Sequence, residues 1–292
     1  MKPLKPTLLL RQGLFAIATL LCVSLAHPQE TLSDTAKRLA SRFSADQKTL
    51  EYHVMVNVPR SAGNDPHKAF SALRETLAPI VQLDQLSRPK AVAYLDSPDR
   101  SLGKDNLVLR IRPGQLTIKV RAPSLNKLID LKPCHSRGNK YERDYFEEPG
   151  YSISAEHRFK KDEWLPDPTK ATVGDVMAFM AKHCTELGKQ LTPYLKPMEH
   201  LTAPGTAQMY DARATLTDQP SAPLQGTDFS LWTFPGSTSM LAEISWKGDA
   251  KDKEVLEKHY TRIRARLSAT GLLAQDQSPK TEQYFTAYFG KK

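Results

Sequence analysis

The stretch NLVLRIRPGQLTIKVRA, residues 106–122, predicts two short strands joined by a Pro-Gly turn. Side chains alternate between the two faces of a strand, so one face of this pair is apolar and the other is cationic. The apolar face carries Leu107, Leu109, Ile111, Leu116, Ile118 and Val120, and the cationic face carries Arg110, Arg112, Lys119 and Arg121. On the alternation alone, these cations either face water, as in an ordinary half-exposed sheet, or line a surface that holds an anion.

The rest of the chain continues the pattern of strands with a few helices. Expected strands cover residues 50–58, 91–96, 140–146, 208–216, 229–234 and 240–247, and expected helices cover residues 65–77, 172–187 and 252–270. Asp65 and Thr172 are the expected N-caps of the first two helices, and Gly188 is expected to end the second. About eight antiparallel strands with flanking helices indicate an α+β fold, closed into a barrel or curved into a deep sheet.

The N-terminus has the features of a secretory signal peptide. Lys2, Lys5 and Arg11 precede an apolar run over residues 14–25, which ends in Ser24-Leu25-Ala26. This pattern predicts cleavage after Ala26, a periplasmic or secreted protein, and no membrane span in the mature chain. An uncleaved N-terminal anchor is the alternative. Residues 27–48 then form a polar lead-in, and residues 49–292 a single domain with a helix near the C-terminus.

Net charge and the absence of known catalytic motifs limit the functions that the sequence supports. The formal net charge is +9, which favours anionic partners such as phosphates. We find no Gly-x-Ser-x-Gly, no Walker loop and no His-Glu-x-x-His motif. Basic residues are not interleaved with aromatic residues as in proteins that bind single-stranded nucleic acid, so no nucleic-acid partner is expected. The oligomeric state is left open.

Two cysteines follow the predicted leader, each beside a histidine: Cys134-His135 and His183-Cys184. In an oxidising compartment, a pair of cysteines most simply forms a disulfide. A four-ligand zinc site is the alternative, although adjacent residues point in different directions on helices and strands.

Several short motifs, taken in order, resemble the core of a CYTH domain, the family of triphosphate tunnel metalloenzymes. The motifs are Tyr94-Leu95-Asp96-Ser97-Pro98-Asp99, Leu109-Arg110-Ile111-Arg112 and Leu116-Thr117-Ile118-Lys119, followed by Tyr141-Glu142-Arg143-Asp144 and Ala242-Glu243-Ile244-Ser245-Trp246-Lys247. The similarity spans roughly residues 50–247 and is closest over residues 92–121.

The resemblance implies an eight-stranded antiparallel tunnel that binds a triphosphate or another polyphosphate. The implied phosphate-binding residues are Arg110, Arg112, Lys119, Arg121, Arg213 and Lys247, and the implied metal ligands are Glu51, Glu142, Asp144 and Glu243. Arginine and lysine suit phosphate oxygens, and carboxylates suit Mg²⁺ or Mn²⁺. The implied activity is metal-dependent phosphohydrolysis.

The first strand departs from the family pattern. The family has Glu-x-Glu-x-Lys there, whereas this chain has Glu51-Tyr52-His53-Val54-Met55. The second carboxylate and the lysine are missing, and His53 stands in place of the carboxylate. Three functions therefore remain open: a phosphohydrolase, a noncatalytic binding protein for phosphorylated anions, and a structural protein that keeps only the fold.

Overall fold

The computed structural model describes residues 33–45, 50–135, 138–146, 149–159, 167–217, 224–237 and 239–290. The predicted signal peptide, residues 1–26, lies outside this part of the chain. No helix among the described residues is long and apolar enough to cross a membrane.

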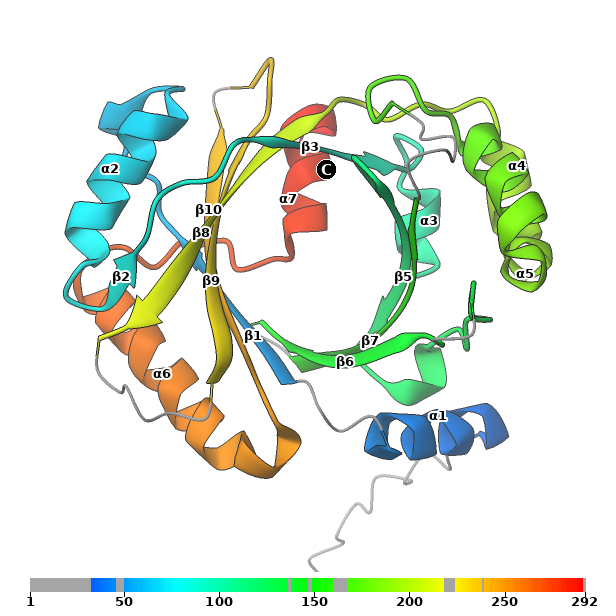
Figure 1. The fold of residues 1–292 in the computed structure, drawn as a ribbon, viewed down its shortest axis with the longest axis horizontal. Helices are drawn as coiled ribbons and strands as arrows, with labels where there is room; N and C mark the ends of the chain where they lie inside the picture. The colour runs from blue at the N-terminus through cyan, green and yellow to red at the C-terminus, as the bar shows by residue number, and fades with distance from the viewer. Residues whose placement is uncertain are drawn as a thin grey trace, which may run out of the picture. The chain divides into compact units, whose positions relative to one another are not determined.

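The described strands form one closed ring. The strands are β1 (Leu50–Val56), β2 (Val81–Leu83), β3 (Lys90–Leu95), β4 (Leu107–Arg112), β5 (Gln115–Ala122), β6 (Lys140–Tyr145), β7 (Pro149–Arg158), β8 (Ala207–Leu216), β9 (Leu224–Thr233) and β10 (Met240–Gly248). Nine of them follow the order β8-β3-β4-β5-β7-β6-β1-β10-β9, and pairing of β9 with β8 closes the ring (Figure 1). The short β2 pairs with the end of β8 outside the ring.

The predicted α+β tunnel is confirmed, with two differences in detail. The ninth ring strand is β7, whose small inward residues Ser152 and Ser154 give a weak strand pattern. Among the described strand pairs, β1 and β6 alone run parallel. Their register sets Glu51 opposite Asp144, two residues about 90 positions apart in the chain.

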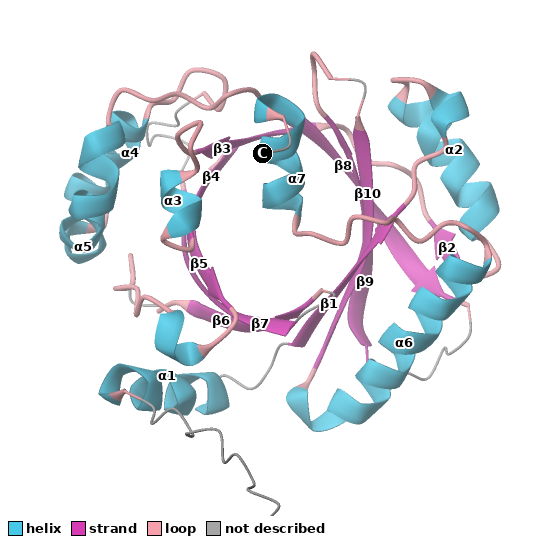
Figure 2. Ribbon diagram, turned by 180° about the vertical axis from the view of Figure 1, so that it is seen from behind, coloured by secondary structure: helices cyan, strands magenta, loops and turns pink. Residues whose placement is uncertain are grey.

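Helices cover the apolar outer face of the ring, except for the last helix, which lies on its inner side. The helices are α1 (Asp34–Ala45), α2 (Pro66–Leu77), α3 (Ser101–Lys104), α4 (Val173–His183), α5 (Thr185–Leu195), α6 (Lys253–Ala269) and α7 (Lys280–Phe289). Side chains of α1, α4 and α5 pack on the outward residues of β4, β5 and β7. Side chains of α2 and α6 pack on the outward residues of β1, β8, β9 and β10. Both helices lie outside the ring in Figure 2. The alternation within β4 and β5 therefore places their leucines outward and their cations inward.

Helix α7 occupies the interior side of the ring, as both views show (Figures 1 and 2). Its Tyr284 and Phe285 pack against inward residues of the strands, including Tyr94, Met55 and Trp232. The Tyr284 ring lies 4.8 Å from the Tyr94 ring, and its hydroxyl group donates to the Gly205 carbonyl oxygen. This helix therefore closes part of the barrel with a third apolar cluster.

The helix expected over residues 172–187 is two helices. Thr172 and Asp175 form the capping box at the start of α4, but α4 ends at His183 and α5 starts at Thr185. Gly188 lies inside α5, and a Cβ atom on it would come within 3.2 Å of the Met180 backbone. This glycine permits close packing of α4 on α5, rather than ending a helix.

Candidate functional site

The interior of the ring contains a polar cavity of about 240 Å³. Charged side chains from strands on several sides of the ring and from α7 line it: Glu51, Arg110, Arg112, Lys119, Arg121, Lys140, Glu142, Glu156, Lys247 and Lys280. The cationic face of the β4–β5 hairpin therefore points into the barrel. The cations of residues 106–122 thus line an enclosed cavity instead of an open, water-facing sheet.

A larger hollow of about 520 Å³ adjoins the cavity. Four residues line both spaces: Val108, Arg121, Phe146 and Thr281. The hollow is bounded by the start of β4, the end of β5 and the residues that lead into α7.

Asp144 on β6 is the most deeply buried acid of the interior, with 0 % of its surface exposed. Its Oδ2 atom lies 3.0 Å from Lys119 Nζ and 3.0 Å from Arg121 Nε. Burial by itself would raise the pKa of Asp144, but the charges of Lys119 and Arg121 outweigh burial and lower it. Asp144 therefore stays ionised and neutralises part of the cationic face.

Glu142 holds a second group of lysines. Its carboxylate lies 2.6 Å from Lys140 Nζ, 3.1 Å from Lys247 Nζ and 3.6 Å from Lys119 Nζ. Lys247 also lies 3.4 Å from Glu51. Each interior lysine of the strands thus has a carboxylate partner, as a buried charge requires.

Arg110 and Arg112 differ from these lysines. Arg110 donates to Thr117 Oγ1 at 3.0 Å, across the β4–β5 pair. Within the described part of the chain, neither arginine forms an ion pair within 4.0 Å, and the buried Nε atoms of both have no hydrogen-bond partner. Burial, with the nearby charge of Arg110, lowers the pKa of Arg112 to about 10. Among the described residues, no carboxylate approaches these two guanidinium groups within 4.0 Å, and the charges of Glu156 and Asp211 act on Arg112 only from farther away.

Glu51, His53 and Asp144 form a candidate metal centre. Each offers a ligand atom, and these atoms lie within 4.8 Å of one another. The parallel register of β1 and β6 brings Glu51 beside Asp144, and the His53 ring stacks on Phe146 with 4.2 Å between centroids. Asp144 Oδ1 and His53 Nε2 are buried without a hydrogen-bond partner. Such orphaned donor atoms fit a bound divalent cation.

Glu243 on β10, a predicted metal ligand, forms an ion pair with a residue of α7. Lys280 Nζ lies 2.5 Å from Glu243 Oε1, and His53 Nδ1 lies 3.4 Å from Glu243 Oε2. Burial would raise the pKa of Glu243, but the charges of Lys280 and His53 lower it to about 2. Lys280 was not expected from the sequence, because nothing local to residues 280–289 indicates that this helix enters the barrel.

The structure therefore brings only some of the predicted site residues together at the cavity. Arg110, Arg112, Lys119, Arg121 and Lys247 line the cavity, and Glu51 and Asp144 share the candidate metal centre with His53. Glu142 and Glu243 are held by lysines. Arg213 is an exposed side chain of β8 and lies apart from the residues that line the cavity.

No protein-family model and no curated protein sequence matches this chain. Several solved structures are similar to it, among them the following three. The first is a candidate adenylyl cyclase from Hippeastrum described as having a dominant triphosphatase activity, with 11% identity, a TM-score of 0.43, and coverage of 81% of this chain and 94% of that one.

The other two are candidate adenylate cyclases from Vibrio parahaemolyticus and Bacillus halodurans. The Vibrio structure has 12% identity and a TM-score of 0.36 over 82% of this chain and 97% of that one. The Bacillus structure has 14% identity and a TM-score of 0.40 over 82% of this chain and 99% of that one. At these identities the similarity is one of fold. A closed α+β barrel with Arg-x-Arg and Thr-x-Lys strands facing a charged interior is consistent with a divergent CYTH-like domain.

Proposed function

We propose that this chain binds a triphosphate or another polyphosphate-type anion inside the barrel. The observation that carries the proposal is the pair Arg110 and Arg112, two inward guanidinium groups without an acidic partner among the described residues. A buried charge without a partner costs free energy, which a multivalent anion offsets when it binds. Guanidinium groups also match phosphate oxygens in geometry, through paired N–H donors.

The rest of the cavity suits a chain of phosphates rather than a single one. Lys119, Arg121 and Lys247 lie farther along the same interior and already share carboxylates. A phosphate chain that reaches them competes with Asp144 and Glu142 for the same donors. Arg110 and Arg112 therefore supply most of the affinity, and the paired cations adjust to the bound anion.

Metal-dependent phosphohydrolysis is the second candidate function, favoured by the Glu51–His53–Asp144 cluster. These residues would hold a divalent cation, which would polarise a phosphoryl oxygen as a Lewis acid. Arg110 and Arg112 would orient the phosphate chain, and Thr117 fixes the Arg110 guanidinium. A carboxylate–imidazole donor set suits Mn²⁺ or Zn²⁺ better than Mg²⁺, which prefers an oxygen shell.

We also propose that the chain is exported. The proposal is supported by the cationic and apolar pattern of residues 1–26 and by the disulfide between Cys134 and Cys184. Its ligand would then be a phosphorylated anion of the periplasm or the surroundings of the cell. N-terminal sequencing of the protein recovered from outside the cytoplasm tests this, and a start before Ala26 contradicts cleavage after that residue.

Binding is tested by calorimetric titration of the protein with tripolyphosphate at low salt. We expect Arg110→Ala and Arg112→Ala each to weaken binding by about ten- to a hundredfold, because a hydrogen bond to a charged group contributes about 1.5–3 kcal/mol. Arg213→Ala is the matched control, because it removes the same charge from an exposed position. Equal affinity of all three variants and the wild type contradicts binding in the barrel.

Hydrolysis is tested separately by phosphate release from tripolyphosphate and ATP with Mn²⁺, Mg²⁺ or a chelator. An enzyme is expected to release phosphate only with metal, and Asp144→Asn is expected to abolish that release. Binding of tripolyphosphate without metal-dependent release supports the noncatalytic alternative.

A further inference from the structure

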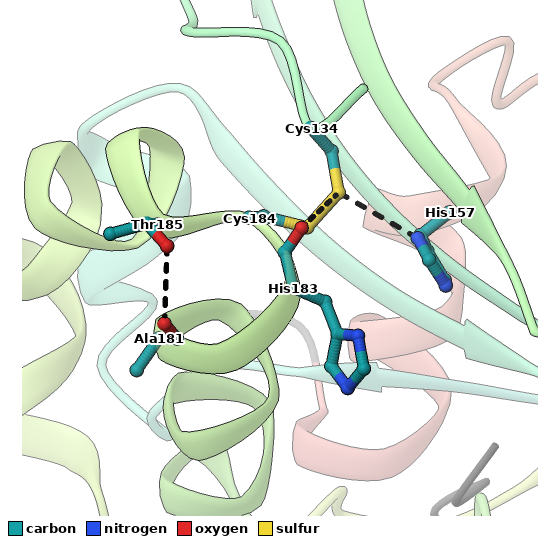
Figure 3. The surroundings of a disulfide bond; sticks show 6 residues. All are labelled: Cys134, His157, Ala181, His183, Cys184 and Thr185. Carbon is teal, nitrogen blue, oxygen red and sulfur yellow. Dashed lines mark hydrogen bonds between the residues drawn. A yellow bond between two sulfur atoms is a disulfide. The ribbon is translucent and has the colours of Figure 1, made fainter. Parts of the chain in front are cut away.

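A second cluster of chemically reactive side chains lies on the outer side of the barrel, away from the tunnel. Cys134 and Cys184 form a disulfide that ties the segment before β6 to the junction of α4 and α5 (Figure 3). The disulfide predicted from the sequence is therefore present. Histidines surround it from three different segments: His135, His157 and His183.

The distances in this cluster are those of a metal site. Ligand atoms of Cys134, His135 and His157 lie within 4.8 Å of one another. Cys134 Sγ lies 3.7 Å from His157 Nδ1, and the rings of His135 and His157 are 5.1 Å apart. In a tetrahedral zinc site, the bond lengths to sulfur and nitrogen place these two atoms about 3.6 Å apart. The sulfur and the imidazole therefore already have the required separation.

The fourth ligand follows from the disulfide itself. The Cys184 sulfur is bonded to that of Cys134, so reduction leaves two thiols side by side. Cys134, His135 and His157 are each half-buried, whereas Cys184 is 4 % exposed. The cluster is thus open to a metal ion on one side and backed by the α4–α5 core on the other.

We propose that Cys134, Cys184, His135 and His157 form a zinc-type site when the disulfide is reduced. A dithiol reductant converts the disulfide to two thiols and is itself oxidised to a disulfide. Two thiols then bind one divalent ion as thiolates and release two protons. Two sulfur and two nitrogen ligands make a closed tetrahedral set, which selects Zn²⁺ over Mg²⁺ or Ca²⁺. The cluster thus holds the same two segments together by a covalent bond in one redox state and by a metal in the other.

The proposal is independent of the tunnel. None of its four residues lines the tunnel cavity, and the donor set differs from that of Glu51, His53 and Asp144. Its test therefore needs a signal that only sulfur ligation produces. Thiolate coordination to Co²⁺, a spectroscopic substitute for Zn²⁺, gives a near-ultraviolet charge-transfer band that carboxylates and imidazoles do not give.

The experiment uses the full chain with Cys22→Ser, so that the third cysteine contributes no thiolate. The protein is freed of metal, reduced with a phosphine and titrated with Co²⁺; the oxidised protein is titrated in parallel. We expect a thiolate-to-cobalt band that saturates at one ion per chain in the reduced protein and is absent from the oxidised protein. Displacement by Zn²⁺ is expected to remove the band.

Variants identify the ligands. His157→Ala and His135→Ala are each expected to weaken Co²⁺ binding by at least about tenfold, the lower range seen when even an outer partner of a metal ligand is lost. Cys134→Ser and Cys184→Ser are each expected to reduce the intensity of the band. His200→Ala, which removes a histidine with a 93%-exposed side chain, is the control and is expected to keep the wild-type band.

Three results overturn the proposal. The first is a reduced protein that binds Co²⁺ without a thiolate band. The second is a band of equal strength and affinity in His157→Ala and His135→Ala, both checked for native circular dichroism. The third is a near-ultraviolet band of equal strength in the oxidised and reduced proteins, which means that the band does not come from the thiolates of Cys134 and Cys184.

Discussion

At the scale of single residues, the inward cations of the barrel are of two kinds. Lys119 and Arg121 are balanced by Asp144, which has no exposed surface. Arg110 and Arg112 have no such partner among the described residues. Alternation along a strand predicts that all four side chains point to the same side of the sheet, but it does not predict their ion-pair partners. Contacts between strands across the ring alone distinguish the cations paired with acids from those available to a ligand.

Removing the Asp144 charge is expected to destabilise the fold. Asp144→Asn leaves Lys119 and Arg121 without their shared carboxylate, and breaking a buried pair costs about 3 kcal/mol of unfolding free energy. Urea unfolding of the metal-free protein measures this loss. Glu186→Gln is the matched control, because Glu186 and Lys189 form an exposed pair whose loss is expected to leave the unfolding free energy nearly unchanged. Similar losses in both variants contradict a structural role for the interior pair.

The low pKa of Glu243 predicts a dependence of stability on pH. The folded state holds this pKa at about 2, against an ordinary value of 4.5, so the ionised form stabilises the fold above pH 4.5. Below that pH the unfolded chain takes up a proton first, and stability is lost as the pH falls toward 2. Between neutral pH and about pH 3, this group accounts for a loss of about 2 kcal/mol.

Urea midpoints of the wild type and Glu243→Gln in chelator, at both pH values, measure this difference. The variant is expected to lose less stability on acidification than the wild type. Equal losses in the two proteins indicate that other carboxylates control the acid transition.

At the scale of elements, α7 is an interior element, although its composition does not mark it as one. Tyr284 is fully buried, and Lys280 from the same helix pairs with Glu243. One face of the helix thus completes the apolar core, while its first residue extends the ion pairs of the tunnel. The helix couples the stability of the barrel to the charges at the candidate site.

Tyr284→Ala is expected to lower the unfolding free energy by about 3–5 kcal/mol, because it removes a buried aromatic ring from the inner cluster. Val255→Ala on α6 is the control; Val255 is 41% exposed, and the change is expected to alter stability by about 0.5 kcal/mol or less. Denaturant unfolding with a tryptophan signal is informative, since Trp232 lies in the same cluster as Tyr284. A loss no larger than that of Val255→Ala means that α7 is not required for the packed interior.

At the scale of the whole molecule, closure of the ring turns one charged sheet face into a lined cavity. An open sheet with the same sequence would expose Arg110 and Arg112 to water, where they would need no partner. The β8–β9 ladder closes the ring, and outer helices cover its apolar face. Enclosing these cations lowers the unfolding free energy of the whole domain. An anion that binds in the cavity of the folded state alone therefore raises the unfolding free energy of the whole domain.

Tripolyphosphate is therefore expected to raise global stability. A ligand that binds only the folded state adds about 2.7 kcal/mol at a hundred times its Kd. Thermal unfolding with and without tripolyphosphate measures the shift, and the double variant Arg110→Ala with Arg112→Ala is expected to lose most of it. The shift is also expected to shrink with added salt, because salt screens the attraction. A shift of equal size in the double variant contradicts binding at these arginines.

Local chemistry made much of the fold predictable. Asp65 accepts hydrogen bonds from the backbone N–H groups of His67 and Lys68, as its position before a proline-initiated helix indicated. The hairpin expected over residues 106–122 forms, and its register sets Leu109 opposite Ile118. The sequence did not predict the break between the two helices at Cys184. Gly188 was expected to end one helix, whereas it lies inside the second helix and allows close packing on Met180 of the first.

The sequence by itself determined which side chains share a face, where the main helices start and that one sheet face is cationic, because caps and alternation depend on neighbours within a few residues. The tertiary structure alone decided that the cationic face is enclosed, that the parallel β1–β6 pair sets Glu51 beside Asp144, and that Lys280 reaches Glu243. Those contacts join residues far apart in the chain. Closure of the ring forms them, and it leaves Arg110 and Arg112 as the cations that an anion can neutralise.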